Sequence, residues 1–346
     1  MKLSSTTYRL YCTYPFGISR SSFDHYDRVF IYLEQDGIIG RGEAAPSERY
    51  NESISQIKER LKTRVDLPKN VKNLNEVINL FDQYTSDIKS LRSACICALF
   101  DWYTQKENIS LNKYFNFDGK IENPISFTIA IGNFDNLEQK VEEAKEYRIL
   151  KIKLGTDQDK EIISTIRNFT AKPIRVDINE GWDLDTAIEM SNWLSKNNVE
   201  LIEQPLPTND LEKMVELKKH SPLPLIADEN CLTSSDIENV VDGFDGINIK
   251  LTKCGGIDEA TRMIDTANKY NLKIMFGCML ESSIGITALG HLASQADYLD
   301  LDGNLLVKND PYSGLLIDSG IPVLPRGNGL GLNLKNDYKI KYPDLK

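Results

Sequence analysis

The chain carries a series of short apolar segments whose last residues are charged. In chain order these segment ends hold Lys151 and Lys153, Asp177, Glu203, Asp228, Lys250, and Asp300 with Asp302. One charged residue in such a place is explained by helix capping or by contact with solvent, so the combination of types is what matters. Only three histidines are present, His25, His220 and His291. We therefore expect lysine and carboxylate groups to carry any acid–base chemistry.

Three of these segment ends are acidic and follow one another along the chain, at Asp177, Glu203 and Asp228. Three carboxylates brought together repel one another unless a cation or protons compensate their charge. A ligand set made only of oxygen atoms favours a hard ion, which points to Mg²⁺. The alternative is a solvated acidic rim.

Two lysines lie on either side of the acidic trio in segment order, Lys153 before it and Lys250 after it. A lysine near a divalent ion and a second lysine should have a lowered pKa, because nearby positive charge disfavours the ammonium form. Such a lysine acts as a base near neutral pH. Together with a metal-bound carboxylate, this arrangement suits removal of a weakly acidic proton next to a carboxylate and stabilisation of the enediolate that forms.

The elements that must position these residues recur at a regular spacing. Apolar segments begin at residues 127, 149, 174, 199, 223, 246, 272 and 298, and amphipathic stretches lie between them. Eight strand-plus-helix steps of this size predict a (β/α)8 barrel, in which the carboxyl ends of all strands meet on one rim. The alternative is an open doubly wound sheet, although no GxGxxG follows the first segment.

Residues 1–120 have a different pattern, typical of an α+β domain. RVFIYLEQ, the Asp36-Gly37 turn and IIGRGEA predict an antiparallel hairpin. Helical patterns follow near 51–63, 73–86 and 89–105, and Cys95 lies on the apolar face of the last one. We place the second domain, the barrel, at 121–346.

Composition narrows the class of protein further. The 346 residues include 51 acidic and 41 basic ones, a net charge of −10, which argues against nucleic acid or an anionic membrane as the main partner. No apolar run reaches the ~18 residues of a membrane span, and the start lacks the apolar stretch of a secretory signal, so we expect a cytoplasmic protein. The six cysteines form no CxxC pair, which argues against disulfides or a thiolate zinc site.

Several spaced motifs resemble those of one known family over almost the whole chain. LKIKLG at 150, RVDINEGW at 175, LIEQP at 201, IADEN at 226 and INIKLTKCGG at 247 resemble the barrel motifs of the enolase superfamily, muconate lactonizing subgroup. GRGEAAPSERY at 40 is similar to the N-terminal domain that covers the barrel mouth in that family. The resemblance implies a (β/α)8-type barrel with an N-terminal α+β capping domain, which the C-terminal tail is expected to join.

The resemblance also implies roles for the charged segment ends. Asp177, Glu203 and Asp228 would bind Mg²⁺, and Lys153 and Lys250 would be the two acid/base catalysts. Lys151 would support Lys153 electrostatically and contact the substrate carboxylate. Lys253 shares the INIKLTK segment and is the alternative to Lys250 as the base.

The last apolar segment bears on the reaction. Asp300 and Asp302 are two residues apart and hence on one face of a strand; this DxD resembles that of dipeptide epimerases, in which the pair receives the α-ammonium of the substrate. The resemblance then implies Mg²⁺-dependent 1,1-proton transfer at the α-carbon of the C-terminal residue of a dipeptide. A strand-end turn with two solvated aspartates is the alternative.

The side chain that the enzyme prefers depends on the capping loops. Arg20 is a candidate partner for an acidic side chain, which favours L-Ala-D/L-Glu, a dipeptide derived from peptidoglycan; the alternative is an exposed loop arginine. His25 and Asp24 would instead favour polar or cationic substrates.

Other functions stay open: o-succinylbenzoate synthase or another cycloisomerase, a Schiff-base aldolase that uses Lys250, and a barrel without catalysis. The sequence also leaves open whether the chain forms a homo-oligomer.

Overall fold

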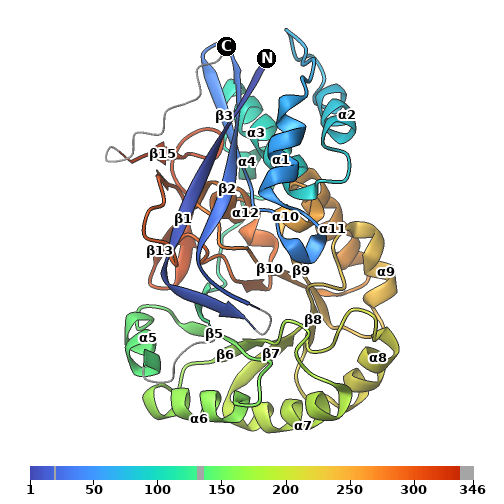
Figure 1. Ribbon diagram of the computed structural model, residues 1–346, viewed down its shortest axis with the longest axis vertical. Coiled ribbons are helices and arrows are strands. Elements are labelled where there is room, and N and C mark those ends of the chain that lie inside the picture. The colour runs from blue at the N-terminus through green and yellow to red at the C-terminus, as the bar shows by residue number, and fades with distance from the viewer. Residues whose placement is uncertain (19–20, 131–135, 336–346) are drawn as a thin grey trace.

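The second part of the chain closes into a barrel of parallel strands. The computed structural model describes residues 1–18, 21–130 and 136–335. Within these residues, eight parallel strands pair in chain order: β4 Ser126–Ile129, β5 Ile149–Lys153, β6 Ile174–Asp177, β7 Val199–Glu203, β8 Leu225–Ala227, β9 Gly246–Ile249, β10 Lys273–Phe276 and β11 Tyr298–Leu299. A parallel bridge between Ile125 and Leu299 joins the last strand to the first. The predicted barrel is thereby confirmed (Figure 1).

Helices between the strands cover the outside of the barrel. They are α5 Leu137–Glu143, α6 Asp159–Phe169, α7 Leu184–Leu194, α8 Leu211–His220, α9 Ile237–Val240, α10 Leu251–Cys254, α11 Ile257–Lys269 and α12 Ser283–Gly290, with short 3-10 turns η3 Ser195–Asn197, η4 Ser234–Asp236 and η5 Ala293–Gln295. Because the strands are covered on both faces, their sequences are almost continuously apolar. The charged residues at their carboxyl ends are therefore the exceptions that need a reason.

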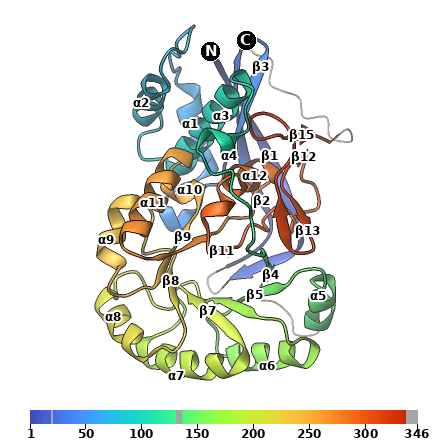
Figure 2. The same cartoon turned by 180° about the vertical axis from the view of Figure 1, so that it is seen from behind.

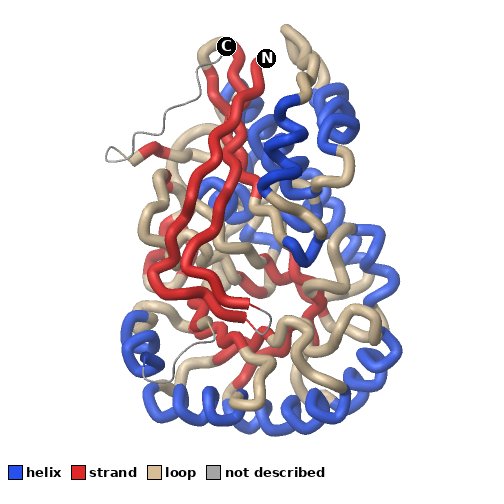
Figure 3. Tube along the Cα trace, in the orientation of Figure 1, coloured by secondary structure: helices blue, strands red, loops and turns tan. Residues whose placement is uncertain are grey.

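The first part of the chain forms a three-stranded antiparallel sheet with helices. Strands β1 Lys2–Ile18, β2 Ser21–Gln35 and β3 Ile38–Ala44 pair in chain order. Asp36 and Gly37 both have positive φ, 55° and 76°, as a tight hairpin turn between β2 and β3 requires. Figure 3 shows the long strands β1 and β2 running down to the rim of the barrel.

Helices complete this first part of the chain. They are α1 Ile54–Lys62, α2 Leu74–Thr85, α3 Lys89–Lys106 and α4 Leu111–Tyr114, with the 3-10 turn η1 Glu48–Tyr50 after β3. Helix α3 lies so close to β3 that a Cβ at Gly42 would stand 1.9 Å from the carbonyl oxygen of Ala94. Cys95 is fully buried in this helix, as its position on the apolar face predicts.

The C-terminal segment packs on the capping sheet. It contains the short strands β12 Tyr312–Ser313, β13 Leu316–Asp318, β14 Ile321–Val323 and β15 Asn333–Leu334, which Figures 1 and 2 place beside β1. Cys12 of β1 forms a bridge with Val307, and the Tyr8 hydroxyl donates to the carbonyl oxygen of Asn309 at 2.8 Å. The division of the chain at about residue 120 stays a prediction.

Two further expectations concern cysteines and membranes. All six cysteines lie in the described residues and are free, and five of them are buried. Among the described helices, none combines the length and the apolar character that a membrane crossing requires.

Candidate active site

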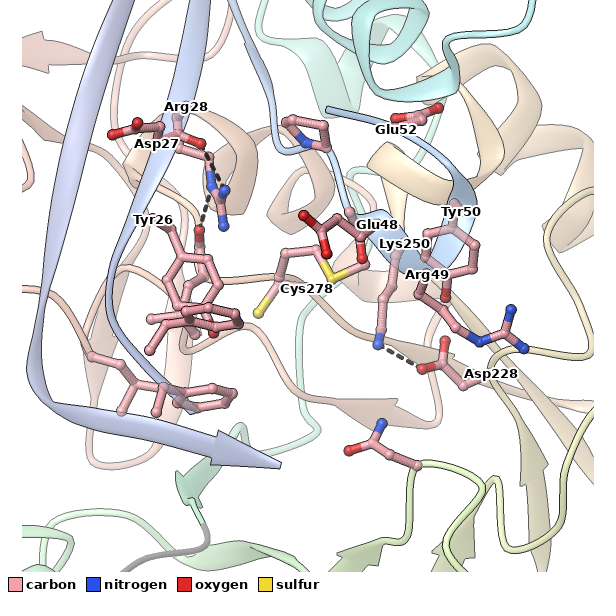
Figure 4. A pocket seen from close by; sticks show the side chains of 18 of the residues that line it. Tyr26, Asp27, Arg28, Glu48, Arg49, Tyr50, Glu52, Asp228, Lys250 and Cys278 are labelled. Atoms are coloured by element: carbon pink, nitrogen blue, oxygen red, sulfur yellow. Dashed lines mark hydrogen bonds and ion pairs between the residues drawn. The ribbon is translucent and has the colours of Figure 1, made fainter. Parts of the chain in front are cut away.

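A cavity of about 660 Å³ lies between the carboxyl ends of the barrel strands and the capping elements. Its floor and sides include Lys153, Asp228, Lys250, Asp300 and Asp302. The capping sheet and the loop that contains η1 supply the remaining wall, as Figure 4 shows for the residues around Lys250. Most of the charged segment ends predicted from the sequence therefore meet at one place.

The three predicted acidic residues are deeply buried at adjacent strand ends. Asp177 pairs in register with Glu203 across β6 and β7, and Asp228 directly follows β8. Asp177 and Glu203 are fully buried, and Asp228 is 1% exposed. This burial excludes a solvated acidic rim.

Lysine side chains neutralise these carboxylates. The Lys151 ammonium lies 2.6 Å from Glu203 Oε2, 2.6 Å from Asp300 Oδ2 and 3.1 Å from Asp177 Oδ2. Burial lowers the pKa of Lys151, but the three carboxylates outweigh burial and the net pKa is raised. In their present positions, no three Asp, Glu, His or Cys side chains among residues 1–18, 21–130 and 136–335 are arranged to coordinate a metal ion.

Lys153 and Lys250 both line the cavity. Lys153 Nζ donates to Asp177 Oδ2 at 2.5 Å, and Lys250 Nζ donates to Asp228 Oδ2 at 2.8 Å. Burial lowers the pKa of Lys250, but the carboxylates of Asp228 and Glu203 raise it by more than burial lowers it. The net pKa therefore lies well above the usual value. The nearest charges of Lys250 are therefore carboxylates. The expected lowering depends on a nearby divalent ion and stays a prediction.

Lys253 has different surroundings, although it lies in α10, the short helix that directly follows Lys250. Its ammonium donates to the carbonyl oxygens of Asp228 at 2.7 Å, Asn248 at 3.1 Å and Cys231 at 3.3 Å, and it also pairs with the Asp228 carboxylate. The side chain is buried and does not line the cavity. Of the two lysines, Lys250 is thus the one with access to a ligand.

Asp300 and Asp302 line the cavity just after β11, and both are buried. Asp300 accepts from Lys151 at 2.6 Å and from the Ser126 hydroxyl at 2.9 Å, and Asp302 Oδ2 accepts the Thr128 N–H at 2.6 Å. Burial and the neighbouring Asp300 carboxylate raise the pKa of Asp302 to about 7. These contacts exclude a solvated turn.

The capping loop makes a contact that sequence reasoning missed. Arg49 donates two hydrogen bonds of 2.8 Å to Glu180, which follows β6, and a third of 3.2 Å to the Thr208 hydroxyl. The adjacent Tyr50 is largely buried, and burial strongly raises its pKa. No spacing signal connects residues 131 positions apart, so only the fold reveals this contact.

A second missed contact fixes the loop after β10. The Glu43 carboxylate on β3 accepts the N–H of Ser282 at 2.9 Å, the Ser282 hydroxyl at 2.6 Å and the Gly285 N–H at 3.2 Å, at the start of α12. Burial raises the pKa of both Glu43 and Glu281. Glu43 thus holds the loop that presents Cys278, Met279 and Leu280 to the cavity.

The predicted Arg20 lies outside the described residues, so the structure leaves its role as a prediction. His25 lines the cavity and contacts Asp24 at 2.5 Å. Both residues lie on β2, near the end of the hairpin.

Two family models match consecutive parts of the chain. The model described as enolase C-terminal domain-like matches residues 135–338. The model of the mandelate racemase / muconate lactonizing enzyme N-terminal domain matches residues 4–115. Together the matches cover the capping elements and most of the barrel.

Similar proteins have similar lengths. An L-Ala-D/L-amino acid epimerase from Flavobacterium johnsoniae is 35% identical over 338 residues, which cover 96% of this chain and 100% of the relative. An L-Ala-D/L-Glu epimerase from Bacteroides thetaiotaomicron is 33% identical over 336 residues, covering 96% and 88%. The crystal structure of a dipeptide epimerase from Cytophaga hutchinsonii, complexed with Mg and the dipeptide D-Ala-L-Val, matches with a TM-score of 0.89 at 26% identity and covers 98% of this chain and 97% of that one. The chain therefore belongs to the mandelate racemase / muconate lactonizing enzyme family of the enolase superfamily.

Proposed function

We propose that the protein is a dipeptide epimerase, an isomerase that moves the α-proton of the C-terminal residue of a dipeptide from one face of the carbon to the other. The observation that carries the proposal is the placement of two lysines in one cavity. Lys153 ends β5 and Lys250 follows β9, four strands further along the described eight-stranded sheet, so they approach the cavity from opposite sides. Two bases on opposite faces of a carbon are what inversion by proton transfer needs.

The proton transfer divides into two steps. One lysine, in its amine form, takes the α-proton from its own face of the carbon. The opposite lysine, in its ammonium form, returns a proton to the other face. The lysine that starts the reaction depends on which enantiomer of the residue is bound.

The donor set fits a divalent cation. Asp177, Glu203 and Asp228 supply only hard carboxylate oxygens, which Mg²⁺ prefers. Glu203 Oε2 is buried and faces Lys151 at 2.6 Å, yet it accepts no hydrogen bond of normal geometry from the described residues. Burial and the neighbouring Asp177 carboxylate raise the pKa of Glu203, so a cation bound here would stabilise its ionised form.

Asp177, Glu203 and Asp228 would hold Mg²⁺, which would supply a Lewis acid for the negative charge that develops on the substrate carboxylate. Lys151 lies beneath the same carboxylates and adds a fixed positive charge. Because this charge is already in place before the reaction, it stabilises the enediolate without reorganisation.

Asp300 and Asp302 support a dipeptide as the substrate. Both line the cavity and supply carboxylates suited to a cationic amino terminus. Dianionic substrates of o-succinylbenzoate synthase or a muconate-type cycloisomerase would meet repulsion there. The names of the relatives from F. johnsoniae and B. thetaiotaomicron favour L-Ala dipeptides, with L-Ala-D/L-Glu as the first candidate.

The test is proton exchange in D₂O. Protein supplied with Mg²⁺ should exchange the α-proton of the C-terminal residue of L-Ala-L-Glu or a related dipeptide and form the epimer, which NMR detects. Absence of exchange across a broad dipeptide library would refute the proposal. Dehydration of the cyclohexadiene substrate would identify o-succinylbenzoate synthase, and borohydride trapping on Lys250 with activity that survives chelation would identify an aldolase.

A further inference from the structure

Gln204, which directly follows Glu203 at the end of β7, has an unusual backbone conformation. Its φ is 38°, in the left-handed region that residues other than glycine rarely adopt. The side chain is fully buried. Strain of this kind costs free energy and persists only where the surrounding structure fixes it, which is common at functional sites. The hydrogen bonds of Gln204 account for its retention in this conformation.

The side-chain amide of Gln204 uses all of its hydrogen-bonding capacity. Its Oε1 accepts the N–H of Asp228 at 3.0 Å and the N–H of Asn230 at 3.1 Å. Its Nε2 donates to the carbonyl oxygen of Leu206 at 2.8 Å and to Asn230 Oδ1 at 2.6 Å. An amide has two acceptor and two donor positions, so all four are occupied. The two N–H donors also fix the orientation of the amide, because a reversed amide would place its own N–H groups against them.

One of these bonds extends the pairing of β7 with β8 beyond its end. The register of the two strands ends with Glu203 opposite Ile226, and the N–H of Gln204 donates to the Ile226 carbonyl oxygen at 2.9 Å. Asp228 lies beyond the end of β8, and its N–H donates to the Gln204 side chain. The amide of Gln204 thus sets the position of the Asp228 backbone relative to Glu203.

The backbone of Gln204 contacts the strand end on the other side, that of β6. Its carbonyl oxygen accepts the Glu180 N–H at 2.9 Å. Glu180 lies three residues after Asp177, in the loop that follows β6. Gln204 is therefore bonded to all the strand ends that carry the carboxylates proposed to hold Mg²⁺, which are Asp177, Glu203 and Asp228.

From these contacts we infer that Gln204 is a positioning residue, which sets the spacing of the three carboxylates and so determines how tightly the protein binds Mg²⁺. The inference rests on the Mg²⁺ site of the proposed function. Ligands that are held in place before the ion arrives lose less conformational freedom when it binds. Groups that orient metal ligands from outside the coordination sphere change the metal affinity by about 10- to 100-fold when they are removed.

The experiment titrates the purified protein with MgCl₂ alone in a calorimeter, without dipeptide, and compares the dissociation constants. Gln204→Met keeps the length of the side chain but removes the acceptor and the donors, so it should raise the dissociation constant about tenfold or more. Gln204→Asn suits a positive φ better but is one methylene too short for these contacts. It should therefore weaken Mg²⁺ binding to a similar extent, although it relieves the backbone strain.

Asn198→Met is the matched control. Asn198 also has a positive φ, 53°, and its amide donates to the carbonyl oxygen of Ala171 at 2.9 Å. It precedes β7, at the end of the strand remote from Glu203. Asn198→Met should lose stability in urea denaturation without Mg²⁺, as Gln204→Met should, but it should keep the wild-type dissociation constant for Mg²⁺.

The outcomes separate positioning from a purely structural role. Wild-type Mg²⁺ affinity in Gln204→Met and Gln204→Asn would overturn the inference, and so would an equal loss of affinity in Asn198→Met. Gln204→Asn provides the same comparison if Gln204→Met does not fold. A wild type that binds no Mg²⁺ would also overturn the inference. A wild type that binds Mg²⁺ but exchanges the α-proton of no dipeptide would instead refute the epimerase function and leave the role of Gln204 intact.

Discussion

Arg49 of the capping loop and Glu180 of the barrel hold each other through two parallel hydrogen bonds of 2.8 Å. The pair joins η1 to the loop after β6, and Arg49 and its neighbour Tyr50 both line the cavity above the barrel strands. Figure 4 shows Tyr50, Arg49, Lys250 and Asp228 gathered at this edge of the cavity. The ion pair therefore fixes the capping loop over the reacting groups.

Arg49→Lys is expected to raise KM for dipeptides by about two- to fivefold, the effect of a partly exposed ion pair, because lysine cannot form two parallel bonds with a carboxylate. The value of kcat should change less, since Lys153 and Lys250 keep their places. Steady-state kinetics check this, with Arg64→Lys as a control in the exposed Arg64–Asp66 pair. An unchanged KM would show that the loop is held by its other contacts.

Lys253 is expected to stabilise the fold and not to transfer protons. Lys253→Met would remove one of the two ammonium partners of the Asp228 carboxylate and the lysine donor of three carbonyl oxygens, at a cost of about 3 kcal/mol or more in the free energy of unfolding. Lys250→Met should cost less, because the Lys250 ammonium donates to the Asp228 carboxylate, whereas that of Lys253 also donates to three carbonyl oxygens. Urea denaturation of both variants measures the difference. Wild-type stability in Lys253→Met together with complete loss of exchange would mean that Lys253 is the base.

The pH dependence of KM should report the ionisation of Asp302. Its pKa in the folded protein, about 7, lies above the usual 3.8, so the carboxyl group is largely neutral below pH 7 and cannot attract an ammonium group. KM for dipeptides should therefore fall as the pH rises from about 6 to 8.

Asp302→Asn is the matched variant for this prediction. It should remove the pH dependence of KM and raise KM about tenfold at pH 8, as expected for the loss of a charge-assisted hydrogen bond. A raised folded-state pKa also means that ionisation opposes folding, so the wild type should lose stability relative to Asp302→Asn as the pH rises from about 4 to about 7. The same pH profile of KM in both proteins would remove Asp302 from substrate binding.

Mg²⁺ should stabilise the protein, because an ion that binds only the folded state shifts the folding equilibrium. At 100 times the dissociation constant the gain is about 2.7 kcal/mol, visible as a rise in Tm. Thermal unfolding in MgCl₂, against NaCl of equal ionic strength, measures it. Glu203→Gln should lose most of the rise. An equal rise in Glu203→Gln and wild type would place the ion elsewhere.

The sequence predicted the barrel and the residues at its mouth because both depend on local pattern. Alternating strands and helices at a fixed spacing set the topology, and the topology brings the strand ends together. Lys153, Asp177 and Glu203 thus occupy adjacent positions in register, as their places in the apolar segments indicate.

Partners that come from distant segments could not be predicted in this way. Pattern alone places Lys250 and Lys253 in the same short segment, and only the turn after β9 directs one to the cavity and buries the other. In the sequence, Glu43 is an ordinary strand residue. Only the fold shows that its carboxylate accepts the Ser282 N–H at the start of α12. The sequence also does not show how closely the carboxylates of Asp228 and Glu203 surround Lys250.

The most direct test of the account follows each lysine separately. Lys153→Ala and Lys250→Ala, each with Mg²⁺ in D₂O, are given the L,L and L,D forms of one dipeptide that the wild type epimerises. Two opposed bases predict that neither variant forms the epimer, and that each still exchanges the α-proton of one form only, opposite in the two variants. Exchange of both forms by a single variant, or epimerisation by either one, would contradict the account.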